Sequence, residues 1–265
     1  MSNKYGIVIE TEYFETRPDY IDSAINAVQN GAYDFVQFVV FPDSYDNLKK
    51  LVSEKFQDIN VVIHAPFFMH GVDLANRDLL NSNLKRLEDS QKFADLLHSK
   101  IIVLHPGIGD GEKYLDETIH QFRVINDSRM AVENLPYHPR PNCKMHGAMP
   151  KNIQKIIAET GCKFCFDFAH AICAANSFGW NIHDTLAEFA SLKPSLYHLC
   201  DGDNAATVDM HLHLGQGSYD LEMIFCDFLR NQNAMITIET HKDKSSDITA
   251  WIEDVKLARN MGLMR

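Results

Sequence analysis

The sequence predicts a (β/α)8, or TIM, barrel that occupies residues 1–265 as a single domain. Three observations lead to this prediction. Short β-branched runs recur along the whole chain, helical segments separate them, and a length of 265 residues suits one such barrel. A doubly wound open sheet is the alternative architecture, but the sequence lacks the Gly-x-Gly-x-x-Gly phosphate loop that would favour it.

Eight runs of β-branched and apolar residues predict the strands. Most are apolar on both faces, which is typical of parallel strands that helices cover. The runs are Tyr5–Glu10, Phe35–Phe41, Asn60–His64, Ile101–His105, Arg129–Glu133, Lys163–Asp167, Leu196–Leu199 and Met235–Glu239.

Apolar periodicity and stop residues predict the helices between the strands. After the third run, apolar residues at three- and four-residue steps share one helix face; they are Leu80, Leu84, Leu87, Ala94 and Leu97. Further helices are expected at Asp19–Asn30, Pro150–Thr160, Ile182–Leu192, Tyr219–Asn231 and Asp247–Met261. The longest stretch without such a pattern, Asn134–Met149, is expected to be a substrate-facing loop.

The composition bounds the function. A hydrophobic content of 45% supplies a large core, and a net charge of −11 argues against a broad electrostatic grip on nucleic acid. The chain has neither a signal-like N-terminus nor an apolar run that could span a bilayer, and it suggests no obligate protein partner. Its six cysteines, including the Cys162/Cys165 pair, fit buried thiols of a cytoplasmic protein.

Ionisable residues follow six consecutive apolar runs, from the third to the eighth. They are His64, His105, Glu133, Asp167, His198 and Glu239. In a barrel, all of these positions converge on the mouth where active sites lie. His, Asp and Glu are the ligands of zinc and similar ions, and a bound cation removes the mutual repulsion of clustered carboxylates.

Further candidate ligands follow the sixth and seventh runs. His170 lies three residues after Asp167, and the Asp209-x-His211 step can place a carboxylate and an imidazole on one ion. His213 is a further candidate of lower rank. The glycines of Gly215-Gln-Gly217 suit a tight turn behind these residues.

These residues resemble those of bacterial-type endonuclease IV, an apurinic/apyrimidinic-site DNA endonuclease within the xylose isomerase-like barrel superfamily. The resemblance covers the chain from about His64 to Glu239. It rests on His64-Ala65-Pro66, His105-Pro106-Gly107, Glu133-Asn134, Asp167-x-x-His170-Ala171, His198-Leu199-x-Asp201, Asp209-x-His211, Leu214-Gly215-x-Gly217 and Glu239-Thr240.

The resemblance implies two or three Zn²⁺ ions, with Mn²⁺ and Mg²⁺ as alternatives. His64, His105 and Glu133 would hold the first ion. Glu133 would bridge to a second ion, which Asp167, His198 and Glu239 would also hold, and His170, Asp209 and His211 would hold the third. A zinc-bound hydroxide would hydrolyse a phosphodiester, with Glu133 and Glu239 as the catalytic residues that position it.

The expected partner is a phosphodiester substrate, with damaged DNA as the family's example. Phe67 and Phe68 would stack on bases, and His138 and Arg140 belong to the best remaining basic patch. The early loops depart from the family pattern: Glu10, Glu12 and Glu15 follow the first run, and Asp43 and Asp46 follow the second. Carboxylates there repel a phosphate backbone.

Two other functions stay open at this point. A sugar or sugar-phosphate isomerase or epimerase of the same superfamily uses a single metal, and Glu133, Asp167, His198 and Glu239 match its ligand set. Such an enzyme has no need of the remaining candidate ligands. The other possibility is a non-catalytic metal-binding barrel, for which the ligand set is unusually complete.

Overall fold

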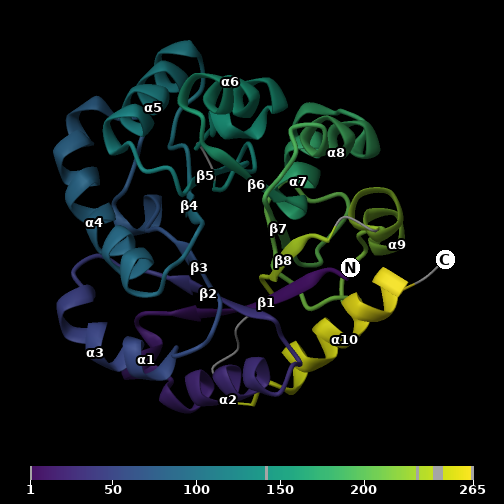
Figure 1. Ribbon diagram of the computed structural model, residues 1–265. Coiled ribbons are helices and arrows are strands. Elements are labelled where there is room, and N and C mark those ends of the chain that lie inside the picture. The colour runs from purple at the N-terminus through teal and green to yellow at the C-terminus, as the bar shows by residue number, and fades with distance from the viewer. Residues whose placement is uncertain (1, 141–142, 231–232, 241–246, 264–265) are drawn as a thin grey trace.

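The strands form a closed parallel barrel in chain order. The computed structural model describes residues 2–140, 143–230, 233–240 and 247–263, and in it β8 pairs with β1 to complete the ring (Figure 1). The strands are β1 (Lys4–Glu10), β2 (Phe35–Val39), β3 (Val61–His64), β4 (Ile102–Leu104), β5 (Met130–Glu133), β6 (Lys163–Asp167), β7 (Leu196–Leu199) and β8 (Met235–Ile238). The predicted (β/α)8 barrel and each of its predicted strands are therefore confirmed.

Helices surround the barrel. They are α1 (Tyr13–Thr16), α2 (Pro18–Gln29), α3 (Tyr45–Lys55), α4 (Leu80–Leu96), α5 (Glu112–Ile125), α6 (Pro150–Thr160), α7 (Phe168–Phe178), α8 (Ile182–Ala190), α9 (Leu221–Met223) and α10 (Thr249–Leu263). Short 3-10 turns lie at Phe68–His70, Arg77–Leu79 and His146–Ala148, and a π-helical segment follows α9 at Ile224–Leu229.

The predicted helices are present: Pro150–Thr160 has the predicted bounds, and the others have shifted ends. The segment predicted at Tyr219–Asn231 begins at Leu221 and turns π-helical, and Asn231 itself lies outside the described residues. Helix α7 was not predicted, because its residues from Phe168 to Ala175 are all buried and no polar face breaks the pattern. The helices α1, α3 and α5 were not predicted either, and the only buried residue of α3 among those described is Val52.

Side-chain alternation along the strands divides the barrel interior into two layers. An apolar layer near the N-terminal ends is formed by Phe35, Val62, Ile101, Val103, Ala131, Cys165 and Leu196. The next inward position lies two residues further along a strand. On several strands that position holds a polar side chain; these are Gln37, His64, Glu133, Asp167 and His198. The alternation of side chains that places apolar residues at the base of the barrel therefore also places polar residues near its mouth.

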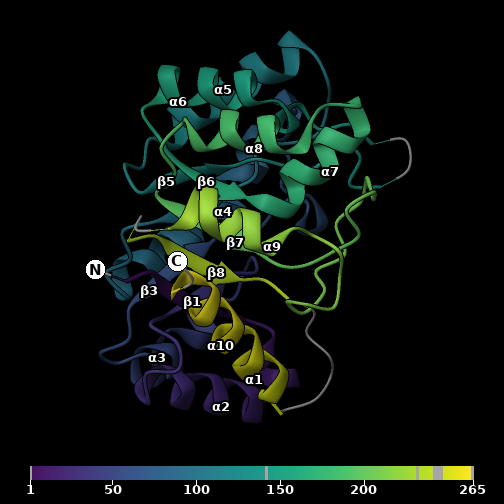
Figure 2. The same ribbon diagram turned by 90° about the vertical axis from the view of Figure 1, so that its right-hand side faces the viewer.

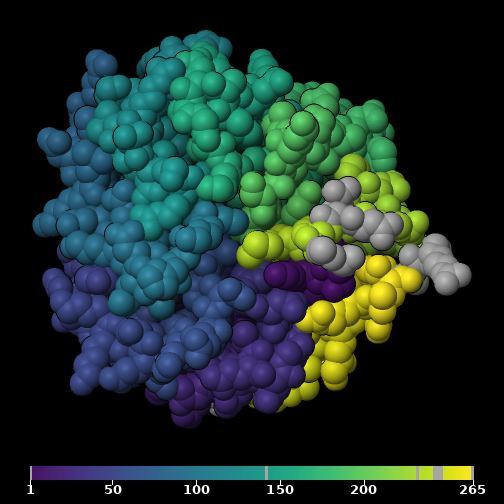
Figure 3. All heavy atoms as spheres, in the orientation of Figure 1, coloured from purple at the N-terminus to yellow at the C-terminus, as the bar shows by residue number. Residues whose placement is uncertain are grey.

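The two ends of the chain meet at the barrel seam. The Tyr5 hydroxyl on β1 donates a hydrogen bond to the Ala258 carbonyl on α10 at 3.1 Å, and Arg259 lies 2.8 Å from Asp34. Figure 3 shows the first strand beside the last helix on this face of the molecule. Figure 2 shows that the long connection after β7 projects from the opposite end of the barrel from the N-terminus.

The predicted longest loop, Asn134–Met149, is not the longest connection in the described chain. A 3-10 turn at His146–Ala148 shortens its irregular part, and the connection between β7 and α9, from Cys200 to Asp220, is longer. The buried carboxylate of Asp201 organises that longer connection. It accepts hydrogen bonds from the backbone nitrogens of Gly202, Gly215, Gly217 and Tyr219.

Candidate metal centre

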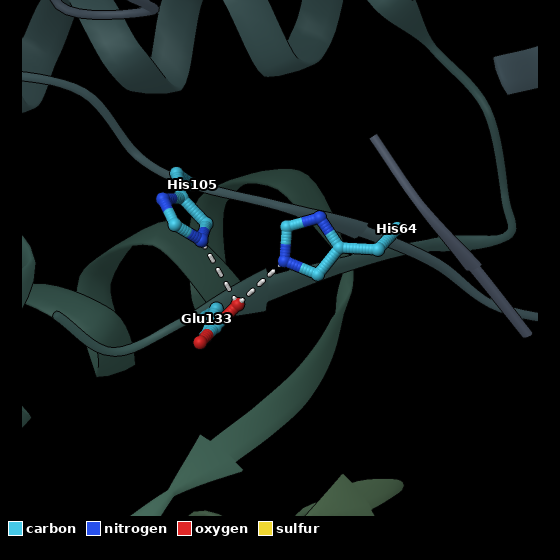
Figure 4. A group of neighbouring side chains, drawn as sticks. All are labelled: His64, His105 and Glu133. Carbon is cyan, nitrogen blue, oxygen red and sulfur yellow. Dashed lines mark ion pairs between the residues drawn. The ribbon is translucent and has the colours of Figure 1, made fainter. Parts of the chain in front are cut away.

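The first group of donor atoms comes from β3, β4 and β5. The Nε2 atoms of His64 and His105 face the same oxygen of Glu133, Oε2, at 3.3 and 3.1 Å (Figure 4). Glu133 ends β5, and its side chain is 1% exposed. His64 and Glu133 are the last residues of their strands, and His105 directly follows β4, so barrel closure brings them together.

A second group surrounds the other oxygen of Glu133. The Nδ1 atom of His198 lies 3.2 Å from Glu133 Oε1, 3.4 Å from Glu239 Oε1 and 3.9 Å from Asp167 Oδ2. Glu133 therefore presents one oxygen to each of two donor groups. This arrangement suits a carboxylate that bridges two cations.

The third group lies between α7 and the connection after β7. The Nε2 atoms of His170 and His211 face Asp209 Oδ2 at 3.6 and 2.7 Å. All nine predicted ligands thus lie in three neighbouring groups at the barrel mouth. Glu133 belongs to the first two groups, and His170 of the third group lies 3.3 Å from Glu133 Oε1.

The two carboxylate oxygens of Asp167 have different neighbours. Its Oδ1 accepts a hydrogen bond from the His170 backbone nitrogen at 2.7 Å, which caps the N-terminus of α7. Its Oδ2 faces the second donor group. The strand-to-helix junction therefore fixes Asp167 and places His170 one helical turn beyond it.

Hydrogen bonds to backbone carbonyls hold the Nδ1 atoms of three rings. The Nδ1 atoms of His64, His170 and His211 lie 2.8, 2.9 and 2.6 Å from the backbone oxygens of Ala65, Asn134 and Glu239. A ring that donates its Nδ1–H to a carbonyl leaves Nε2 as the lone-pair donor. The side-chain Nδ2 of Asn134 also donates to the Asp167 carbonyl at 2.8 Å.

The donor set fits divalent cations. Glu133 Oε2 and Asp209 Oδ2 are buried and make no hydrogen bond within the described residues, although imidazole nitrogens face them. Tetrahedral ligands at about 2.0–2.1 Å from zinc lie roughly 3.3 Å apart. Most of the distances between donor atoms given above lie between 3.1 and 3.9 Å, which is close to that spacing. Nitrogen and carboxylate oxygen are also the donors that zinc uses.

Without a cation, the centre balances its charge by protonation. Burial works to lower the pKa of His170, but Asp167 and Glu133 raise it to about 10. In the same way, burial works to lower the pKa of His211, but Asp209 raises it to about 9. Burial raises the pKa of Asp167 to about 7. Cations bound between these groups would displace those protons.

Residues that the sequence analysis missed surround the ligands. Gln37 and Thr237, on β2 and β8, contact the second group through hydrogen bonds among their side chains and His198. Cys165 and Cys200 were expected only to pack, but their sulfur atoms lie within 4.8 Å of donor atoms of the second and third groups. A strand pattern gives no sign of these roles, because it does not reveal which polar side chain meets which neighbour.

A cavity of about 560 Å³ lies over the centre, and mainly apolar side chains line it. Phe67 and Phe68, the predicted stacking residues, form part of its wall. His138 and Arg140 are not among the lining residues; His138 faces the Cys143 carbonyl at 3.0 Å, and the Arg140 guanidinium lies 5.6 Å from the Phe68 ring centroid.

Two histidines near the mouth are structural. The Nδ1 atom of His213 lies 2.6 Å from a carboxylate oxygen of Asp254 on α10, away from the donor groups. His146, in the loop predicted at Asn134–Met149, is fully buried, and its ring lies 3.1 Å from the Thr118 hydroxyl. Neither ring belongs to a donor group among the described residues.

Known proteins with a similar sequence have the same kind of barrel. The family model described as xylose isomerase-like TIM barrel matches residues 22–261. A relative named endonuclease 4, from Thermus thermophilus, is 28% identical over 210 residues, which are 73% of this chain and 75% of that protein.

None of the helices in the described part of the chain has the length and apolarity needed to cross a membrane.

Solved structures share the fold at lower identity. An endonuclease IV from Thermus thermophilus superposes with a TM-score of 0.66 at 23% identity, over 97% of this chain and 98% of that chain. A D-tagatose 3-epimerase-like protein superposes with a TM-score of 0.72 at 17% identity, over 97% and 96%. Superposition therefore shows the barrel but does not choose between the two chemistries.

Proposed function

The chain belongs to the xylose isomerase-like TIM barrel family, and from that premise we propose that it is a metal-dependent phosphodiester hydrolase that resembles endonuclease IV. Two or three Zn²⁺ ions would bind at the barrel mouth, with Mn²⁺ and Mg²⁺ as alternatives. His64, His105, Glu133, Asp167, His170, His198, Asp209, His211 and Glu239 would be their ligands.

One observation carries the proposal: the two oxygens of Glu133 face separate groups of donors. Oε2 faces His64 and His105, whereas Oε1 faces His198. A third group around Asp209 lies beyond them. A single cation cannot use all of these atoms, and clusters of divalent ions are typical of enzymes that cleave phosphate esters.

The ions would supply a nucleophile from water at neutral pH and stabilise the charge that develops on the phosphate and the leaving oxygen. The protein residues position the reacting groups. Glu133 and Glu239 are the proposed catalytic residues, because both carboxylates reach the donor groups and both line the cavity. Burial of His198 and Glu133 keeps bulk water from this part of the centre.

The cavity wall indicates how a substrate would bind. None of the described residues in the wall is Lys or Arg, and Glu10 is one of them. The attraction for phosphate would therefore come from the bound ions rather than from side chains. Phe67 and Phe68 offer flat faces for a base or another planar group, while His138 and Arg140 would contact the substrate outside the cavity.

A sugar or sugar-phosphate isomerase or epimerase is the second candidate. The mainly apolar cavity of about 560 Å³ has the size of a small-molecule site. The second donor group, with Glu133, Asp167, His198 and Glu239, would hold the single ion of such an enzyme. The resemblance of the barrel to a D-tagatose 3-epimerase-like protein agrees with this candidate as well.

Metal content and substrate choice test the proposal together. Elemental analysis of the purified protein is expected to give two or three ions per chain, and one ion would favour the isomerase. Activity is then compared on a duplex with one abasic site, on a simple phosphodiester and on ketose sugars. Hydrolysis of the simple ester alone would exclude the DNA-repair role, and sugar epimerisation without hydrolysis would overturn the proposal.

A further inference from the structure

Gln37 is a polar side chain inside the barrel. It occupies the middle of β2 and is 0% exposed. Its position lies two residues beyond Phe35, so its side chain points inward directly above the apolar base layer. A buried amide costs free energy unless its donors and acceptor are satisfied, so its partners indicate why the barrel keeps it.

The amide connects two of the proposed ligands. Its Oε1 accepts hydrogen bonds from His198 Nε2 and from the Thr237 hydroxyl, both at 2.8 Å. Its Nε2 donates to Glu239 Oε1. An amide has one donor end and one acceptor end. The Glu239 carboxylate can only accept, so it takes the donor end of the amide, and the acceptor end therefore faces His198 and the Thr237 hydroxyl, which anchors it.

This orientation decides how His198 can act. An Nε2–H that donates to the amide oxygen leaves Nδ1 as the atom that can hold a cation. Nδ1 is the nitrogen that faces the oxygens of Glu133 and Glu239. The other histidines of the centre present Nε2 and have their Nδ1 atoms held by backbone carbonyls, with His105 the exception among the described residues. The orientation of the His198 ring depends instead on the side chain of Gln37.

We propose that Gln37 is a positioning residue that selects the tautomer of His198 and holds the Glu239 carboxylate, so that the second donor group can bind its ion. The inference rests on the proposed metal-dependent function. It goes beyond that function because binding of the second ion would depend on Gln37, a residue that would not contact the ion.

The test compares Gln37→Met with a matched control. Methionine fills a similar volume but offers neither the acceptor nor the amide donor. Gln121 is also a glutamine buried to 0% exposure, and its amide bonds Asn83, Asn76 and Glu117 near α4 and α5 rather than the barrel mouth. Circular dichroism establishes that each variant folds, and both variants are then loaded with zinc alone.

Gln37→Met is expected to bind one zinc ion fewer per chain, or to bind that ion 10- to 100-fold more weakly, a range of about the size found for partners behind a ligand. Gln121→Met is expected to bind zinc as the wild type does. In ¹⁵N spectra of the zinc-loaded protein, His198 is expected to carry its proton on Nε2, and this pattern is lost in Gln37→Met. Thr237→Val keeps the amide but removes its anchor, and it is expected to show a smaller loss.

Two results would overturn the inference. One is an unchanged zinc content and affinity in both Gln37→Met and Thr237→Val. The other is a His198 ring in the wild type that carries its proton on Nδ1. If the wild type binds one ion only, the multi-ion function fails, but the tautomer of His198 in that one-ion form still decides the role of Gln37.

Discussion

The substitution Gly217→Ala tests whether the connection after β7 positions the third donor group. A Cβ atom added at this glycine would lie 2.3 Å from the Gly202 carbonyl oxygen and 2.4 Å from Asp201 Oδ1. Ordinary contact begins at 3.4 Å, so Gly217→Ala must move backbone or carboxylate by roughly 1 Å. Asp201 is 1% exposed, so it has little room to move.

The cost follows from the bonds that such a shift disrupts. The Gly217 nitrogen donates to Asp201 Oδ2 at 3.0 Å, and the Ser218 nitrogen donates to the Gly202 carbonyl at 2.7 Å. A hydrogen bond to a charged group contributes about 1.5–3 kcal/mol, and one between neutral groups about 1 kcal/mol. We therefore expect Gly217→Ala to lower the free energy of unfolding by about 2–4 kcal/mol. For a chain of this length, the melting temperature falls by roughly 5–10 °C.

The same shift reaches the donor atoms. Asp201 and Leu212 exchange backbone hydrogen bonds at 2.9 and 3.0 Å, and Leu212 directly follows His211. We expect Gly217→Ala to lose the zinc ion held by Asp209 and His211 while the remaining ions stay bound. Zinc content per chain and thermal denaturation measure the two effects on the same sample.

Gly161→Ala is the matched control. Gly161 has a φ of +70° and an added Cβ would meet nothing within 4 Å, so the substitution strains a helix end without displacing a neighbour. It should cost about 1 kcal/mol and leave the zinc content unchanged. A Gly217→Ala protein that melts like the wild type and keeps all its zinc would refute the argument, as would equal zinc loss in both variants.

Three further outcomes are expected. Glu239→Gln should lower kcat at least about a hundredfold and leave the fold intact, as turnover assays and circular dichroism would show; normal turnover would refute the catalytic role. Zinc binding at neutral pH should release protons and weaken as the pH falls, because His170 and His211, with pKa values raised to about 10 and 9, must give up protons to bind an ion. Calorimetry in buffers of different protonation enthalpy measures that release, and equal heats in all buffers would argue against it. Arg140→Ala should weaken binding of a DNA duplex by a few-fold and leave hydrolysis of a simple phosphodiester unchanged, since Arg140 lies outside the cavity wall; an equal loss on both substrates would contradict this.

Much of the candidate centre could be predicted from the sequence because barrel geometry makes strand ends converge. Once β3 to β8 are placed, residues at their C-terminal ends such as His64 and Glu133 must meet. The local pattern also predicted Asp167 and His170, which the start of α7 holds one helical turn apart. The predictions for His64, Glu133 and Asp167 needed only strand positions and the direction of the chain, whereas the ligand role of His170 rested on the resemblance to endonuclease IV.

The parts that escaped prediction depend on pairing between distant segments. Gln37 appears in the sequence as one polar residue within an apolar run, and only the parallel register of β1, β2 and β8 brings it to His198. Asp201 likewise gains its role from a connection that returns to it at Gly215 and Gly217. Such contacts are set by tertiary geometry, which a one-dimensional pattern does not contain.

The bonds behind the donor atoms predict how the protein responds when its ions are removed. His64, His170 and His211 are held by carbonyls, and Asp167 is held by the start of α7; none of these bonds involves an ion. The centre is therefore preformed, and the large apolar core does not depend on it. Chelation should leave the far-ultraviolet circular dichroism at 25 °C unchanged.

The melting temperature should nevertheless fall on chelation. An ion held at a hundred times its dissociation constant adds about 2.7 kcal/mol to the folded state, and its loss returns carboxylates such as Glu133 Oε2 to a buried state without a hydrogen bond. Zinc added back should restore the original melting temperature without a slow refolding phase. Collapse of the circular dichroism on chelation would instead mean that the ions build the barrel mouth, because a preformed centre has no reason to unfold when it is emptied.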